Sequence, residues 1–475
     1  MSNQSGKLSV KTKLLFGFGD FGMQVLTAFI QFCQLAYYTD VCGIQPGLAG
    51  TAILVGKLTW DMVNDVLFGW LEDKTKSRLG RRRPYLIFCA IPLMLTFWLM
   101  LSLPVGMTNV KAFFAIVGTA LLFDTFSTLV TTAYSSMTAE LTTDYDERTS
   151  VSTYRMMFNI TGYLLGAAAS FLLGDVIISA FGVTKQQAYS IMGLFFGFLA
   201  CLSSLVVGLF VRNKPAVESE PTEIPPIKAI VSVFANKPFD RYMIINLFMS
   251  CAFTVVTTVV SYYIFISLNL TGSFDFLIVV GIMMVILAIC IIPCSKVVMK
   301  IGKAKTYALG LGIASAALLV GTFISKSQGG SSTLIAVIAV AAVAGLGFSS
   351  QWVCPHSMIP DVIEYDELLT GERREGLYYG VNGMVGKISG ALGSAIVGWI
   401  LEFGGYNSAL PMAAQEMTQK LDFSVRFLFG ILPALLLLTC VPLLIRYPIT
   451  KESHAEVVEE LRKRKESAAA SAGNN

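Results

Sequence analysis

The chain has 475 residues, of which 54% are hydrophobic and only 14% are charged. Soluble domains carry about 25% charged residues, so this composition excludes an ordinary soluble enzyme. We attribute the small formal net charge of +4 to membrane topology and predict no nucleic-acid partner. The nine cysteines and two histidines show no spacing typical of a disulfide framework or a structural metal site.

Apolar runs recur from the N-terminus onward, and each is long enough to cross a bilayer core of about 30 Å as a helix. The predicted spans are 14–40, 47–71, 84–104, 111–136, 153–180, 188–211, 239–268, 274–299, 304–325, 332–359, 376–402 and 422–446. The first run is too long for a cleaved signal peptide, and no small-residue cleavage site follows it. The sequence therefore predicts an all-α polytopic membrane protein with twelve transmembrane helices.

The basic residues are distributed unevenly over the loops between these spans. Most of the 35 Lys and Arg residues fall on the side that receives both termini. Cytoplasmic loops carry such an excess in membrane proteins. We therefore expect a multi-pass protein of the plasma or inner membrane, with both termini in the cytoplasm.

A hydrophilic connection rich in Pro and Glu divides the spans six and six, as a linker between two bundles would. We predict an N-terminal six-helix bundle (1–211), a cytoplasmic linker (212–238), a C-terminal six-helix bundle (239–446) and a cytoplasmic tail (447–475). The end of this tail, "ESAAASAGNN", is expected to be disordered.

The loop after the second span, "GWLEDKTKSRLGRRRP", recurs in a weaker form after the eighth span as "SKVVMKIGKAKTY". Two six-helix bundles related by a repeat, with a site between them, are typical of alternating-access transporters. We predict that the loop holds neighbouring helix ends in one conformational state through Gly69, Asp73, Gly80, Arg81, Arg82 and Arg83. The alternative interpretation is a topological anchor only.

Charged residues inside the second span are the strongest indication of function. They lie in the segment "WDMVNDVLFGW" and, for Lys57, three residues before that segment. A charge at bilayer depth costs about 3 kcal/mol, so it usually faces a cavity or a partner. Lys57, Asp61 and Asp65 are spaced four residues apart and share one helix face, with Asn64 beside them. Two carboxylates and an amide oxygen predict a reversible Na⁺ or proton site. The alternative is a structural ion pair with Lys57.

The fourth span places Asp124, Ser127, Thr128 and Thr131 on one face. In a functional interpretation, their hydroxyls complete an ion site or bind substrate. The alternative is that they donate hydrogen bonds to carbonyls of their own helix. Arg155 and Lys387 are the remaining cations within spans. Arg155 lies near a helix end, where snorkelling to water is the alternative, whereas Lys387 has apolar helix on both sides. Tyr134 and other aromatic residues are candidates for stacking on a sugar or for an interfacial belt.

Three segments together resemble one known family: "WDMVNDVLFGWLEDKTKSRLGRRRPYL", "AYSSMTAELTTDYDERTSVSTYRMMFNITG" and "MIPDVIEYDELLTGERREGLYYGVNGMVGKISGALGSAIVGWI". They resemble the glycoside–pentoside–hexuronide:cation symporters, the branch of the major facilitator superfamily that includes melibiose permease. The resemblance implies the major facilitator fold, with twelve helices in two six-helix bundles. It also implies a monomeric membrane transporter and no enzyme activity. Its implied function is symport of a sugar or glycoside with Na⁺ or H⁺, with no other cofactor.

The resemblance also implies roles for individual residues. The coupling cation would be held by Asp61, Asp65 and the Ser127 hydroxyl, with Asn64 tuning cation choice. It places Arg155, Asn382 and Lys387 near the sugar, and we add Gln24, Asp124 and Tyr134 as expected substrate residues. Gln24 and Val130 stand where a galactoside transporter of the family has acidic residues, so galactoside specificity is not implied.

Three alternatives remain open at this stage. The cavity candidates carry one positive charge in excess, from Lys57, Arg155 and Lys387 against Asp61 and Asp65; this suggests an anionic sugar such as a uronide or a sulfonated sugar, unless Asp124 cancels the excess. A sodium-dependent lysolipid transporter is similar to the family and shares Gln at the Gln24 position. An intramembrane Mg²⁺-dependent prenyltransferase also uses Asp-rich helices, but the second acidic cluster, 361–367, falls in a predicted cytoplasmic loop.

Overall fold

The computed structural model describes the chain except for residues 1–7, 62–63, 66, 69–70, 73–74, 76, 142–144, 212–231, 235, 271–272, 325–329, 372–373, 411 and 473–475. Every regular element in the described part is helical. Nine helical spans there are long and apolar enough to cross a membrane, and Ala90–Met100 is a shorter apolar helix. The predicted all-α membrane fold is therefore confirmed.

The N-terminal half contains α1 (Val10–Ala36), η1 (Tyr37–Val41), α2 (Pro46–Gly56), η2 (Lys57–Asp61), α4 (Arg83–Phe88), α5 (Ala90–Met100), α6 (Asn109–Leu141), α7 (Tyr145–Phe181) and α8 (Lys185–Phe210). The C-terminal half contains α10 (Lys237–Tyr262), η3 (Tyr263–Ser267), α11 (Ser273–Ile301), α12 (Lys303–Thr322), α13 (Gly330–Thr370), α14 (Glu375–Gly404), η5 (Met412–Ala414), α15 (Gln419–Arg426), η6 (Phe427–Ile431) and α16 (Leu432–Ile445). The chain continues into α17 (Lys451–Ala472).

Polar residues at helix starts explain where several of these helices begin. The Ser9 and Asn236 side chains accept hydrogen bonds from backbone N–H groups in the first turns of α1 and α10. Thr184 and Gln187 form a reciprocal capping box at α8. Such caps satisfy backbone donors that have no partner within the helix. The long apolar stretches after them then need no further backbone partners inside a membrane.

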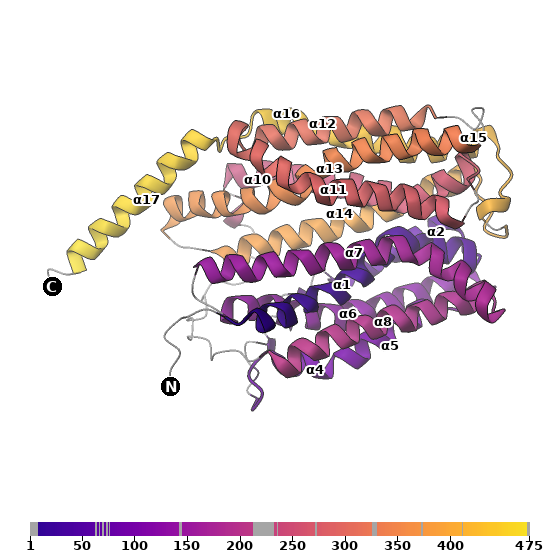
Figure 1. The fold of residues 1–475 in the computed structure, drawn as a ribbon, viewed down its shortest axis with the longest axis horizontal. Coiled ribbons are helices and arrows are strands. Elements are labelled where there is room, and N and C mark those ends of the chain that lie inside the picture. Colours follow the sequence, from indigo (N-terminus) through magenta and orange to yellow (C-terminus); the bar gives the residue numbers. More distant parts are fainter. Residues whose placement is uncertain are drawn as a thin grey trace.

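The helices form two groups that pack side by side (Figure 1). In the N-terminal half, α1 packs on α7 and α8, and α5 packs on α6 and α8. In the C-terminal half, α10 packs on α14 and α16, and α12 packs on α13 and α16. Among the described helices, the halves meet mainly where α2 and η2 pack on α14, α7 on α11, and α1 on α10. The start of α1 and the whole of α17 lie at one end of the molecule, here called the terminus end.

The internal repeat suggested by the loops has a structural counterpart. The Arg82 guanidinium donates to the carbonyl of Ser136 near the end of α6, and Lys303 Nζ donates to the carbonyl of Ser357 in α13 at 2.8 Å. Arg83 also donates to the carbonyl of Gly208 at the end of α8, at 2.7 Å. These basic residues therefore tie each loop to neighbouring helices of its own half. Gly80 has φ +93°, a turn that requires glycine. Gly69 and Asp73 lie outside the described residues.

The expectation of a disordered end to the tail is wrong as far as Ala472, because α17 continues to that residue. Thr450 and Ser453 exchange backbone-to-side-chain hydrogen bonds at its start. The Glu, Lys, Arg and Ala residues that follow are strong helix formers. A polar composition that cannot form a core can thus still form a surface helix.

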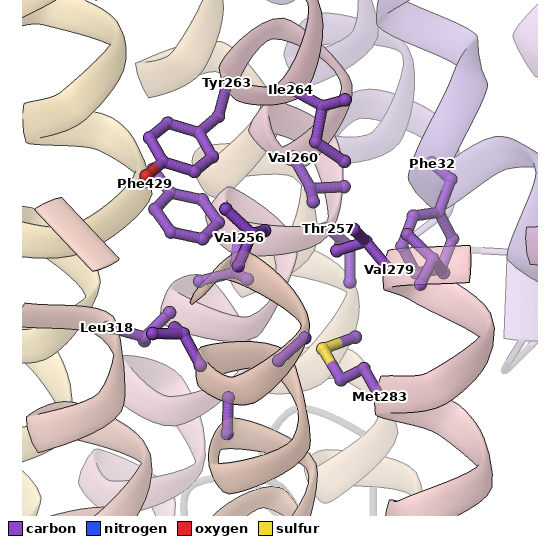
Figure 2. A pocket seen from close by; sticks show the side chains of 15 residues that line it. Phe32, Val256, Thr257, Val260, Tyr263, Ile264, Val279, Met283, Leu318 and Phe429 are labelled. Atoms are coloured by element: carbon purple, nitrogen blue, oxygen red, sulfur yellow. The ribbon is translucent and has the colours of Figure 1, made fainter. Parts of the chain in front are cut away.

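The C-terminal half encloses a small apolar cavity of about 20 Å³ between α10, α11, α12 and α13 (Figure 2). Phe32 of α1 closes one side, and the stacked rings of Tyr263 and Phe429, 3.9 Å apart, close another. Its lining includes two hydroxyls, and both have partners: Thr257 donates to the carbonyl of Phe253 and Tyr263 to the carbonyl of Gly321. A cavity of this size holds at most about one water, and a water needs polar partners. We therefore assign it to packing and not to substrate.

Close contact between α2 and α14 joins the two halves at the end opposite the termini. A Cβ added at Gly398 would lie 2.3 Å from the Pro46 carbonyl oxygen. We expect Gly398→Ala to lower the free energy of unfolding by about 1–3 kcal/mol, because the two backbones must separate. The control is Gly380→Ala on α14, where an added Cβ meets no atom within 4 Å; alanine there should be neutral or slightly stabilising. Unfolding in detergent compares them, and equal stabilities would contradict the expectation.

Candidate substrate and cation site

A cavity of about 520 Å³ lies between the halves, bounded by α1, η2 and α6 on one side and by α10, α13 and α14 on the other. Pockets of roughly 300–1,000 Å³ accept small molecules. Polar and charged side chains contribute much of its wall: Thr27, Gln31, Gln34, Lys57, Asp124, Ser127, Thr128, Thr131, Ser250, Thr254, Gln351, Lys387 and Ser394. This is the polar cavity that the sequence predicted at the interface of two bundles.

Lys57, Trp60 and Asn64 of the second span contact α6. Lys57 Nζ lies 3.5 Å from Asp124 Oδ1, and the Trp60 indole N–H donates to Thr125 Oγ1 at 2.8 Å. Asn64 is fully buried and donates to the carbonyl of Asp124 at 3.5 Å. The alternative of an ion pair for Lys57 is therefore present, but its partner is Asp124 of another helix.

Asp65 connects the two halves. Lys387 Nζ on α14 lies 2.8 and 2.7 Å from its two carboxylate oxygens. The side chains are 39% and 30% exposed for Asp65 and Lys387, so water or an ion can reach the pair. Two residues predicted for different roles, cation and substrate binding, are thus in direct contact. The side chain of Asp61 lies outside the described part of the structure.

Two further oxygen atoms, one on the second span and one on α6, have the chemistry of cation ligands. The Asn64 Oδ1 atom is buried and has no hydrogen-bond partner. Ser127 lies three residues after Asp124 on α6 and lines the cavity, and its hydroxyl bonds to no other described residue. Leaving a buried acceptor unsatisfied costs about 1–3 kcal/mol. Hard cations take such amide, hydroxyl and carboxylate oxygens as ligands.

Arg155 and Tyr134 form a separate cluster with Asp20, which the sequence analysis missed. Arg155 makes a bidentate ion pair with Asp20, at 2.6 Å for Nε and 3.1 Å for Nη2. Its guanidinium carbon lies 4.6 Å from the centre of the Tyr134 ring, whose hydroxyl donates to the carbonyl of Phe16. Neither Arg155 nor Tyr134 lines the cavity in this conformation.

The other predicted substrate residues are placed less directly. Gln24 lies half-buried on α1 and is not part of the cavity wall. The Asn382 amide oxygen accepts from Asn246 at 3.0 Å, and Ser250 donates to Asn246 at 3.1 Å. Of these, only Ser250 lines the cavity. Asn382 therefore reaches the cavity through two intermediate side chains.

The expected positive excess is wrong for the described groups. Lys57 pairs with Asp124, Lys387 with Asp65, and Arg155 with Asp20. The earlier count omitted Asp20 and left Asp124 undecided. Because each of these three cations has a carboxylate partner, charge balance gives no argument for an anionic substrate.

Three acidic residues of the second acidic cluster, 361–367, form ion pairs with basic side chains. Asp361 pairs with Lys303 at 2.6 Å, Glu364 with His454 at 2.8 Å, and Asp366 with Arg374 at 2.6 Å. These described pairs stay within the C-terminal half, at the terminus end. They do not extend to the cavity.

At the opposite end, hydrogen bonds join the halves. Thr39 and Tyr262 share a hydrogen bond at 2.7 Å, and the Gly47 N–H donates to the Glu402 carboxylate at 2.7 Å. Trp399 donates to Thr51 at 2.9 Å. These contacts form a polar seam between the halves on the side away from the termini.

Two helical halves around a polar, charged cavity define a multi-pass membrane transporter. Residues 15–451 match the model of the MFS/sugar transport protein family, and the chain belongs to that family. The family resemblance noted from the three motif segments is confirmed at this level.

Several known proteins are similar over nearly their whole length. An uncharacterised symporter of Synechocystis is 27% identical, covering 97% of this chain and 98% of the relative. The glucuronide carrier protein homolog of Escherichia coli is 26% identical over 97% of each chain. The sphingosine-1-phosphate transporter MFSD2B of Xenopus tropicalis is 25% identical over 95% of this chain and 91% of its own. Among solved structures, a bacterial homologue of the lysosomal transporter Spinster has a TM-score of 0.63 at 12% identity, covering 93% and 98%; this shows the fold alone.

Proposed function

We propose that the protein is a symporter that couples uptake of a sugar or glycoside to Na⁺ or H⁺ by alternating access. The contact between Asp65 and Lys387 carries the proposal, because it joins the expected cation site to the expected substrate site across the two halves. Membership of a sugar transport family supports a transporter over the prenyltransferase alternative. The basic partners of the second acidic cluster also leave little for Mg²⁺ to bind.

In the proposed cycle, the coupling ion and Lys387 compete for the Asp65 carboxylate. A cation held by Asp65, Asn64 Oδ1 and Ser127 displaces the ammonium, which then faces the cavity and binds substrate hydroxyls or a carboxylate. Ion and substrate therefore raise each other's affinity, as linkage requires. Asp61 is proposed to add a second carboxylate to the ion site. Without an ion or Lys387, a carboxylate enclosed in the cavity would be costly.

We further propose that the terminus end faces the cytoplasm, in accordance with its basic residues. The seam formed by Thr39, Tyr262, Gly47 and Glu402 then closes the outer side. Arg82 and Arg83 would hold the inner ends of α6 and α8 while the halves rock. Opening of the outer side requires this seam to separate.

A lipid cargo is the second candidate, favoured by the similarity to the sphingosine-1-phosphate transporter. The hydrogen-bonding groups around the cavity favour a sugar, because an acyl chain gains nothing from burying hydroxyls and amides. Relatives named for a glucuronide and for a lipid phosphate both make anionic cargo worth including in the test.

The test is uptake into proteoliposomes of a neutral glycoside, a uronide, a sulfonated sugar and a lysolipid, with and without an imposed Na⁺ or proton gradient. We expect gradient-dependent accumulation of one sugar class by the wild type. Asp65→Asn should lose accumulation, because the neutral amide no longer binds the ion. Asp422→Asn is the matched control, since Asp422 pairs with Arg426 outside the cavity. Accumulation of lysolipid alone, or full activity of Asp65→Asn, would refute the proposal.

A further inference from the structure

Three glycines leave helix backbone exposed on the α14 side of the cavity, beside Lys387 and Ser394. Gly383, Gly386 and Gly390 line it, and a Cβ added at Gly383 or Gly386 would meet no atom within 4 Å. At Gly390 the nearest atom would be the Thr254 hydroxyl, 3.6 Å away. By contrast, a Cβ at Gly393 would lie 3.1 Å from a backbone oxygen of α10. Helix packing therefore explains Gly393 but leaves the cavity-facing glycines unexplained.

Two buried hydroxyls border the same space. Thr254 on α10 is 7% exposed and Thr128 on α6 is 4% exposed, and both line the cavity. Thr27 and Thr131, also in the wall, bond to the carbonyl four residues earlier, the usual arrangement for helix hydroxyls. The Thr254 and Thr128 hydroxyls bond to no described protein group. Neither oxygen is sealed from the cavity, so both can bond to a polar ligand there.

We propose that these residues form a ring subsite for the substrate. One face of a hydroxylated ring packs flat on the backbone at Gly383 and Gly386, and its hydroxyls bond to Thr254 and Thr128. Glycine permits this approach because any side chain would occupy the ring's position. Lys387 follows Gly386 directly, so a polar or acidic group of the same ring lies within reach of its ammonium. The subsite rests on the proposed sugar transport function and specifies how the sugar is held.

Stability and transport together test the subsite. Gly386→Val should raise the KM for 4-nitrophenyl β-D-glucuronide and 4-nitrophenyl β-D-glucoside at least tenfold, whichever the wild type accumulates. Cation affinity should not change, because the new side chain enters empty space. Gly380→Ala and Gly380→Val, on the same helix but outside the cavity wall, should leave KM unchanged.

Thr254→Val separates a ligand role from a structural one. Removing an unpartnered hydroxyl should leave the substrate-free protein as stable as the wild type or more stable, while substrate affinity falls about tenfold. Thr257→Val is the control: its hydroxyl bonds within α10, so it should lose stability and keep affinity. If the wild type accumulates no sugar or glycoside of the uptake panel, the proposed function fails and the subsite with it. If it accumulates one and Gly386→Val and Thr254→Val keep wild-type KM, the subsite alone is overturned.

Discussion

Lys387→Met is expected to abolish gradient-driven sugar accumulation while raising the affinity for the coupling cation. In the structure the Lys387 ammonium occupies both oxygens of Asp65, so an ion must displace it. The pair is partly exposed, and such pairs contribute about 1 kcal/mol. Removing the competitor should therefore tighten cation binding about fivefold. Substrate loses its ammonium at the same time, so tighter ion binding accompanies lost transport.

Cation titration of the purified protein, followed by the fluorescence of Trp60 and the other tryptophans, measures the first effect. Uptake into proteoliposomes measures the second. Lys57→Met is the matched control, because it removes a cavity ammonium whose partner is Asp124. The proposed displacement of the Lys387 ammonium from Asp65 by a cation is refuted if Lys387→Met binds cations no better than the wild type. It is also refuted if Lys57→Met has the same effect as Lys387→Met.

The helices were predictable because their determinants are local. Apolar runs and capping residues such as Thr184 act within a few positions of the helix that they specify. The π-helical turns were not predictable, because no local pattern in the sequence marks them. Tyr37 begins one of them, and its hydroxyl accepts the backbone N–H of Leu103. The tail was misjudged because a polar composition argues against a core and says nothing against a surface helix.

The candidate site likewise has features that could be predicted from local sequence and features that could not. The spacing of Lys57 and Asp65 predicted that they face inward, since helix periodicity alone determines the face. Their partners depend on which helices meet, and Asp65 finds Lys387 322 positions away. Asp20 was a detectable omission: it is an acidic residue inside the first span, and any such residue is a functional candidate. Including it would have removed the apparent positive excess.

Asp20→Ala is expected to lower the free energy of unfolding by about 3 kcal/mol, because it leaves the Arg155 guanidinium largely buried without a counter-charge. The bidentate geometry and the ring of Tyr134 beneath the guanidinium hold that charge in place. Removing both members should be far less harmful than removing one. The double variant Asp20→Ala, Arg155→Met should therefore recover most of the lost stability.

Denaturant unfolding in detergent measures the two single variants and the double variant as a cycle. Glu459→Ala, which breaks an exposed pair with Arg462 on α17, serves as the control and should change stability by less than about 0.5 kcal/mol. A double variant as unstable as Asp20→Ala would mean that Asp20 acts through packing and not through charge. Recovery of stability without recovery of uptake would instead assign Arg155 to transport, as the family resemblance implies, with Asp20 as the group that neutralises it between substrates.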